Sequence, residues 1–152
     1  MSAGDKFFID TNVFLYQMSG REPEKRASAE TWIDAVWRSE CGRLSWQVIY
    51  EVYSNAVGKF QIQPAQARFF VKHLMEWEPV APGSRSIERA WHWCDKAELH
   101  FWDAMILAAA EQCECAWLVS EDLQGGRKYG SVTVINPFRR DPAEFGLTGH
   151  TQ

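Results

Sequence analysis

The chain has 152 residues, of which 46% are apolar and eight are tryptophan, so it is expected to bury a substantial core as one domain. Its net charge of −4 excludes a simple electrostatic nucleic-acid binder, but not an enzyme that acts on nucleic acid through bound cations. No apolar run is long enough for a transmembrane helix, and residues 1–6 lack the pattern of a signal peptide, so the cytoplasm is the expected location.

The first predicted element is a short buried strand. The apolar run Phe7–Ile9 stops at Asp10, and apolar spacing resumes at 13–16, which indicates a helix or turn. In open α/β sheets ligands collect outside the carboxyl ends of the strands, which is where Asp10 would lie. Asp10 or Asn12 could equally cap the following helix, and this stretch alone favours neither interpretation.

The rest of the chain predicts alternating helices and short strands. Apolar residues at helical spacing predict helices over residues 23–38, 46–60, 64–77, 87–98 and 101–112. Ser45 and Ser86 are the expected N-caps of two of them. Short strands are predicted near 42–44, near 79–82, and over 116–119 and 132–135. Strands separated by helices imply an α/β fold, with a mostly parallel sheet covered by helices on both faces.

The four cysteines do not predict a metal site. Cys113 and Cys115 have one residue between them and no second pair with metal-ligand spacing, so reduced and mostly buried thiols are expected.

Asp103 is the most informative anomaly in the sequence. Its helix, residues 101–112, is apolar on all sides, which normally means burial. An ionised carboxylate there is costly unless it is paired, hydrogen-bonded or bound to a metal. The alternative is a capping role, because the helix dipole favours negative charge in the first turn.

Two further acids extend this pattern. Asp122 follows an apolar strand as Asp10 does, so the two would open into one crevice if their strands are neighbours. Glu121 is equally acidic, and spacing alone does not choose between them. Glu51 lies on the polar side of its predicted helix near Gln47, where a glutamate is usually only solvated.

Four segments, read together, resemble the signature blocks of the PIN-domain family. They occur in the family's order over residues 7 to about 138, and the small toxin ribonucleases of VapC type are the most similar members. The ending Ile135-Asn136-Pro137-Phe138 also resembles a subset of these toxins. The four blocks are Phe8-Ile9-Asp10-Thr11-Asn12-Val13, Trp46-Gln47-Val48-Ile49-Tyr50-Glu51-Val52, Phe101-Trp102-Asp103-Ala104 and Leu118-Val119-Ser120-Glu121-Asp122.

This resemblance implies a compact three-layer αβα sandwich that cleaves RNA at an acidic pocket holding Mg²⁺ or Mn²⁺. The acids carried over as metal-binding and catalytic residues are Asp10, Glu51, Asp103 and Asp122. Thr11, Asn12 and Ser120 are carried over as supporting residues. Such an all-oxygen site selects hard cations, and crowded carboxylates without a cation should raise at least one pKa. The number of metal ions is left open, and no histidine is required.

The resemblance also implies partners and one domain. It predicts RNA as substrate and a cognate antitoxin lying over the acidic pocket, while the tryptophans near 32, 37 and 46 are consistent with a homodimer as well as with core packing. One domain is expected over 1–152, with a core over 7–138 and a C-terminal tail over 139–152, of which the residues after Asp141 are expected to be loose.

Other functions remain as alternatives. A PIN-like binding module without activity, and a PIN nuclease of RNA processing or DNA cleavage, fit the same blocks. An aspartyl-phosphate phosphotransferase of the haloacid-dehalogenase type fits poorly, because Asn12 stands where a second acid is needed.

Overall fold

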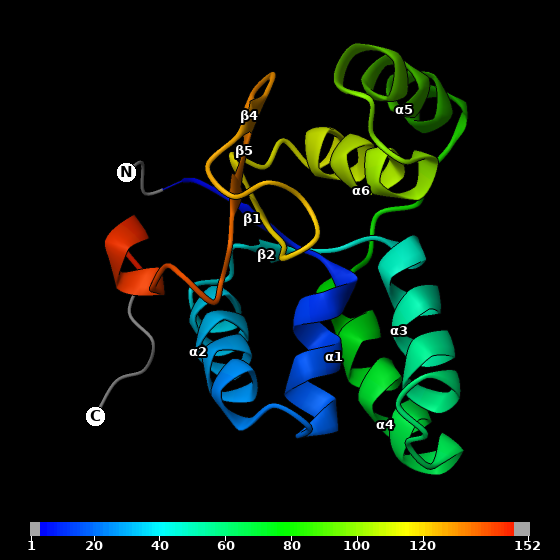
Figure 1. The fold of residues 1–152 in the computed structure, drawn as a ribbon, viewed down its shortest axis with the longest axis vertical. Coiled ribbons are helices and arrows are strands. Elements are labelled where there is room, and N and C mark those ends of the chain that lie inside the picture. The colour runs from blue at the N-terminus through cyan, green and yellow to red at the C-terminus, as the bar shows by residue number, and fades with distance from the viewer. Residues whose placement is uncertain (1–3, 148–152) are drawn as a thin grey trace.

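In the computed structural model, which describes residues 4–147, short strands and longer helices alternate along the chain (Figure 1). The strands are β1 (Phe7–Ile9), β2 (Gly42–Arg43), β3 (Trp117–Val119), β4 (Lys128–Tyr129) and β5 (Val132–Ile135). The helices are α1 (Thr11–Ser19), α2 (Pro23–Arg38), α3 (Trp46–Gly58), α4 (Pro64–Leu74), α5 (Ser84–Ala97) and α6 (Phe101–Gln112). Two 3-10 turns, η1 (Met75–Trp77) and η2 (Pro142–Phe145), complete the described part.

The strands form one sheet in the order β2-β1-β3-β5-β4, parallel except for β4, which runs antiparallel to β5. Consecutive residues of a strand point to opposite faces of the sheet. Phe7, Phe8 and Ile9 are all fully buried, so both faces of β1 are covered. Helix α6 packs against β3 and β5, while α2 contacts β2. The α/β fold with helices around a mostly parallel sheet is therefore confirmed.

Figure 1 shows how the helices are grouped. Helices α1 to α4 lie side by side in the lower half of the view, and α5 and α6 form a pair at the upper right. The predicted helices over 23–38 and 101–112 are confirmed to the residue. Ser45 caps α3 as expected, because its side chain accepts a hydrogen bond from the backbone N–H of Val48.

One local prediction is wrong, and one strand was not predicted. Ser86 does not cap a helix over 87–98, because α5 begins at Ser84 and Gly83 is its N-cap residue. The Ser86 hydroxyl instead accepts a hydrogen bond from the Gly83 N–H, three residues upstream. The sequence also gave no indication of β4, a two-residue strand that pairs with β5 across a tight turn at Gly130.

The C-terminal segment is ordered further than expected. Phe145 and Leu147 are buried, and the Phe145 ring packs against Phe7, Trp32 and Trp117 at centroid distances of 6.5, 5.8 and 5.0 Å. Up to residue 147 this segment is therefore part of the core rather than a loose tail. The rest of the predicted tail, 148–152, lies outside the described residues.

The cysteines agree only in part with the expectation of reduced, mostly buried thiols. All four are free, but only Cys115 is buried and the other three are partly exposed. Among the helices of residues 4–147, none combines the length and the apolar character that spanning a bilayer requires.

Candidate functional site

Asp10 lies at the carboxyl end of β1 and faces the next strand. Because β1 and β3 pair in parallel with Ile9 opposite Val119, Asp10 lies level with Ser120. Its carboxylate accepts hydrogen bonds from the Ser120 hydroxyl and from the Thr11 N–H, both at 2.7 Å. The Thr11 bond caps α1, so Asp10 is a helix cap that also lies at the carboxyl end of the strand, where a ligand is expected. The two interpretations of this stretch are thus compatible.

Asp122 is linked to Asp10 through hydrogen bonds of the Ser120 hydroxyl. The Ser120 hydroxyl, which donates to Asp10, accepts a hydrogen bond from the Asp122 N–H at 3.1 Å. Asn12 makes a parallel link, because its amide donates to Asp10 at 3.5 Å and accepts from the Glu121 N–H at 3.3 Å. The ends of β1 and β3 are therefore tied together by polar side chains, as expected for neighbouring strands.

Glu51 is brought in from α3 by two hydrogen-bond donors. The Thr11 hydroxyl donates to one carboxylate oxygen at 2.6 Å, and the Gln47 amide donates to the other at 2.9 Å. The same Gln47 nitrogen also donates to the Trp102 carbonyl at 3.1 Å, which links α3 to the start of α6. The Gln47 contact with Glu51 follows from their spacing of four on a helix. Nothing in the sequence predicts the contacts with Thr11 and Trp102.

Asp103 completes the group from the first turn of α6. Within residues 4–147 its carboxylate accepts no hydrogen bond, so it caps no backbone N–H of α6, although its place in the first turn is one that the helix dipole favours. It lines one pocket of about 310 Å³ together with Asp10, Glu51, Glu121 and Asp122. The four acids predicted from the sequence therefore converge, although they are as much as 112 positions apart in the chain.

Burial and crowding change the acidity of two of these groups. Burial raises the pKa of Asp10 from 3.8 to about 7, and the nearby charges of Asp122 and Glu51 add to this, against the lowering effect of the Ser120 hydrogen bond. Burial also raises the pKa of Asp103, again with Asp122 and Glu51, while His100 opposes the shift. The expected raised pKa is confirmed, but desolvation contributes more to it than repulsion does.

Comparison with known proteins identifies the architecture. The family model for the PIN domain matches residues 7–128. The chain belongs to the PIN domain family.

One solved structure shows the same fold. A chain described as a toxin-antitoxin complex from Klebsiella pneumoniae superposes on this PIN domain with a TM-score of 0.59 and 19% identity. The match covers 87% of this chain and 98% of the other. No curated protein matches the sequence of this chain.

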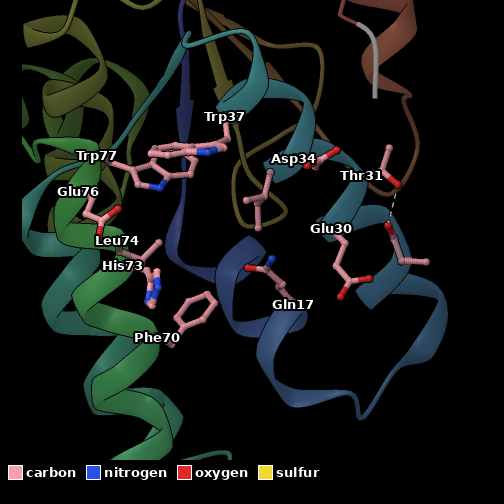
Figure 2. A pocket seen from close by; sticks show the side chains of 12 residues that line it. Gln17, Glu30, Thr31, Asp34, Trp37, Phe70, His73, Leu74, Glu76 and Trp77 are labelled. Atoms are coloured by element: carbon pink, nitrogen blue, oxygen red, sulfur yellow. Dashed lines mark hydrogen bonds between the residues drawn. The ribbon is translucent and has the colours of Figure 1, made fainter. Parts of the chain in front are cut away.

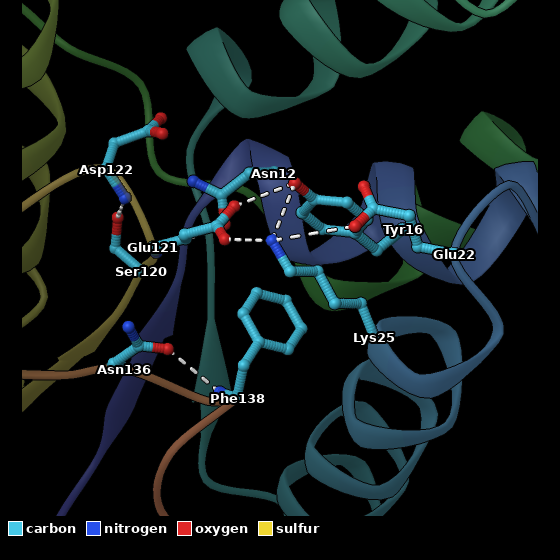
Figure 3. Close-up of polar contacts among 9 residues, drawn as sticks. All are labelled: Asn12, Tyr16, Glu22, Lys25, Ser120, Glu121, Asp122, Asn136 and Phe138. Carbon is cyan, nitrogen blue, oxygen red and sulfur yellow. Dashed lines mark hydrogen bonds and ion pairs between the residues drawn. The ribbon is translucent and has the colours of Figure 1, made fainter.

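Glu121 lines the same pocket as the other acids of the PIN domain, but it has a cation of its own. The Glu121 carboxylate pairs with Lys25 of α2 and accepts a hydrogen bond from the Tyr16 hydroxyl at 2.8 Å (Figure 3). The Lys25 ammonium also lies 4.8 Å from the Tyr16 ring centroid and 5.1 Å from that of Phe138. Figure 3 shows the Asp122 carboxylate directed away from this cluster. Glu121 is thus compensated by its own cation, while Asp122 is free to face the pocket.

The donor set of the acidic pocket suits a hard cation. Apart from Lys59, its charged groups are carboxylates, which Mg²⁺ and Mn²⁺ prefer as ligands. Burial opposes the ionisation of Asp10 and Asp103. A bound cation would favour the charged form of these two groups. In residues 4–147 no three His, Cys, Asp or Glu side chains are gathered closely enough to hold a metal ion as they stand. A cation would therefore have to draw the acids together.

A larger groove of about 710 Å³ lies elsewhere on the PIN domain, between α1 and α2 on one side and α4 and η1 on the other (Figure 2). Trp37, half exposed, packs against Trp77 there at a centroid distance of 5.4 Å. Gln17 projects into the groove from α1, and its buried carbonyl oxygen has no hydrogen-bond partner in the described chain. None of the four converging acids lines this groove.

Proposed function

We propose that this PIN domain is a divalent-metal-dependent endoribonuclease and the toxin of a toxin-antitoxin pair, acting in the cytoplasm where its RNA substrate is found. The observation that carries the proposal is the convergence of Asp10, Glu51, Asp103 and Asp122 in one pocket of a PIN fold. A non-enzymatic module has no need of four acids whose mutual repulsion and burial oppose ionisation.

Asp10, Asp103, Asp122 and Glu51 would hold Mg²⁺ or Mn²⁺. The bound cation would supply positive charge for the phosphodiester and lower the pKa of a water molecule near it. Ser120 and Thr11 fix the carboxylates of Asp10 and Glu51 through hydrogen bonds of 2.7 and 2.6 Å, so these acids are oriented before substrate arrives. The role of these four residues in hydrolysis is part of the proposal.

The test is cleavage of mixed structured RNAs by the purified protein with Mg²⁺, with Mn²⁺ and with EDTA. We expect metal-dependent cleavage that is lost, by about 100-fold or more, in Asp10→Asn and Asp103→Asn. Asp95→Asn, on the exposed side of α5, is the matched control and should keep full activity. Folded protein that cleaves no RNA with either metal would contradict the proposal and favour a binding module.

The proposed partner is an antitoxin protein, a role supported by the likeness to the Klebsiella pneumoniae toxin-antitoxin complex. The groove of Figure 2 offers it an aromatic surface at Trp37 and Trp77. A segment of the partner over the acidic pocket would bring basic side chains to the four acids. Homodimer formation is a further proposal, consistent with exposed apolar side chains such as Trp37 and Phe69. A complex whose partner contacts neither the groove nor the pocket would contradict this arrangement.

A further inference from the structure

Trp102 stands at the rim of the acidic pocket with its indole largely in solvent. Its exposed fraction is 58%, although it is among the largest apolar side chains in the protein. Other large apolar side chains in residues 4–147 are also exposed, but Trp102 alone among them lines the pocket that holds the four acids. It directly precedes Asp103 in the chain, so the indole is fixed within one residue of a proposed metal ligand.

Contacts of the Trp102 backbone and ring hold the indole in place. The Trp102 carbonyl accepts a hydrogen bond from Gln47, and the same amide nitrogen binds Glu51. The Trp102 ring packs edge to face against Phe101, at a centroid distance of 5.0 Å and an interplanar angle of 72°. No other ring or cation of the described chain packs on it, so at least one face of the indole is open.

Cations occupy another part of the same rim. Lys59 and Phe60, at the end of α3, also line the acidic pocket. The guanidinium of Arg21 lies 4.9 Å from the Phe60 ring centroid and donates a hydrogen bond to the Lys59 carbonyl at 3.3 Å. The floor of the pocket repels phosphate, so positive charge at the rim is what a nucleic-acid strand needs there. An open aromatic face together with rim cations is the combination that binds single-stranded nucleic acid.

We propose that Trp102 stacks on an unpaired nucleobase next to the scissile phosphate, while Lys59 and Arg21 contact the backbone of the same strand. The proposal rests on the proposed ribonuclease function and specifies its substrate as single-stranded or looped RNA. A base inside a duplex presents its faces to neighbouring bases, so it has no free face for the indole. Trp102 is thus a binding and specificity residue rather than a group that takes part in hydrolysis.

The experiment combines variants of Trp102 with abasic nucleotides. A short single-stranded RNA with one cleavage position is prepared with an abasic site at each flanking nucleotide in turn, and KM and kcat are measured. We expect Trp102→Ala to raise KM by about 10- to 100-fold with little change in kcat, and Trp102→Phe to restore most of the loss. One abasic position should weaken the wild type by the same factor and leave Trp102→Ala unaffected.

Trp91→Ala is the control, because Trp91 is 56% exposed on α5 and does not line the acidic pocket. Equal losses in Trp91→Ala, or additive effects of Trp102→Ala at every abasic position, would overturn the stacking proposal. So would a Trp102→Ala protein that changes only its oligomeric state. Should the wild type cleave no RNA, fluorescence anisotropy of the same labelled RNAs tests stacking separately: the same pattern in binding supports it, and its absence rejects it.

Discussion

Asp10 is the most tightly enclosed acid of the pocket. It is 3% exposed and is held by Ser120 and Thr11, and burial raises its pKa to about 7. The unfolded chain releases this proton near its ordinary value of 3.8, so between these two values the folded state holds a proton that the unfolded state lacks. In the absence of metal, the free energy of unfolding should therefore fall as the pH rises from about 4 through about 7.

The prediction concerns Asp10→Asn, which keeps the size of the side chain and removes its charge. At pH 8 without metal, the variant should be more stable than the wild type, by at most about 4 kcal/mol, and the difference should shrink toward pH 4. Urea denaturation in EDTA between pH 4 and 8 measures this. Asp95→Asn should show no such trend, and an Asp10→Asn protein less stable than the wild type at pH 8 would contradict the assignment.

A second residue-level prediction concerns the cluster of Figure 3. Lys25→Met leaves the Glu121 carboxylate, which is 28% exposed, without its cation, and should cost about 1 kcal/mol. Glu121→Gln in the same background should recover part of the loss, since no unpaired charge remains. A double-mutant cycle measured by urea denaturation gives the coupling. Lys72→Met, on the exposed side of α4, is the control, and zero coupling would show that the ion pair does not stabilise the fold.

The local sequence pattern predicts the candidate acids, but it does not predict the residues that contact them from distant parts of the chain. Asp10 and Asp122 follow apolar strand runs, and Asp103 interrupts an apolar helix, so each leaves a signal within a few residues. The pairing of Lys25 with Glu121 joins positions 96 apart in the chain and leaves no such signal. The two adjacent acids therefore differ in a long-range contact that the local sequence does not indicate, and the choice of Asp122 for the site stays a prediction.

At the level of elements, the position of β2 depends on how closely Trp77 and Val36 approach Gly42. A β-carbon added to Gly42 would lie 2.6 Å from the ring of Trp77 and 2.9 Å from the side chain of Val36. These contacts place η1 and α2 directly against the strand. A residue larger than glycine would push them apart, and with them one wall of the groove of Figure 2.

We predict that Gly42→Ala destabilises the protein by about 1–3 kcal/mol, because a rigid ring and a helix must move to admit the methyl group. Gly58→Ala is a matched control, since Gly58 ends α3 with open space around its added β-carbon. This second variant should gain up to about 1 kcal/mol from the better helix propensity of alanine. Thermal unfolding of both proteins measures the difference, and equal melting temperatures would contradict it.

Element prediction succeeded where the hydrophobic period ran over many residues. Helices α2 and α6, of 16 and 12 residues, repeat their period three times or more. Strand β4 has two residues, Lys128 and Tyr129, and its existence depends on pairing with β5. The start of α5 was missed because a glycine serves as its N-cap, and Gly83 carries no side-chain signal of that role.

For the whole molecule, metal binding should couple to stability. Mn²⁺ at 100 times its dissociation constant should stabilise the fold by about 2.7 kcal/mol, a rise in Tm of roughly 5–10 °C for a domain of this size. At one fixed Mn²⁺ concentration the rise should be larger at pH 8 than at pH 6, because a proton competes with the cation for Asp10, whose pKa is raised to about 7. Differential scanning calorimetry of the wild type and Asp103→Asn checks this. An equal rise in the Tm of Asp103→Asn would show that Mn²⁺ binds outside the acidic pocket.

The order of the sheet determines when the pocket exists during protein synthesis. Strand β3, which leads to Ser120 and Asp122, lies between β1 and β5, the first strand and the last to be made. A growing chain that ends before β3 has Asp10, Glu51 and Asp103, but it lacks Asp122 and the strand that pairs with β1. The proposed acid set is consequently incomplete until residue 122 of 152 has been synthesised, so every shorter nascent chain on the ribosome lacks part of the site.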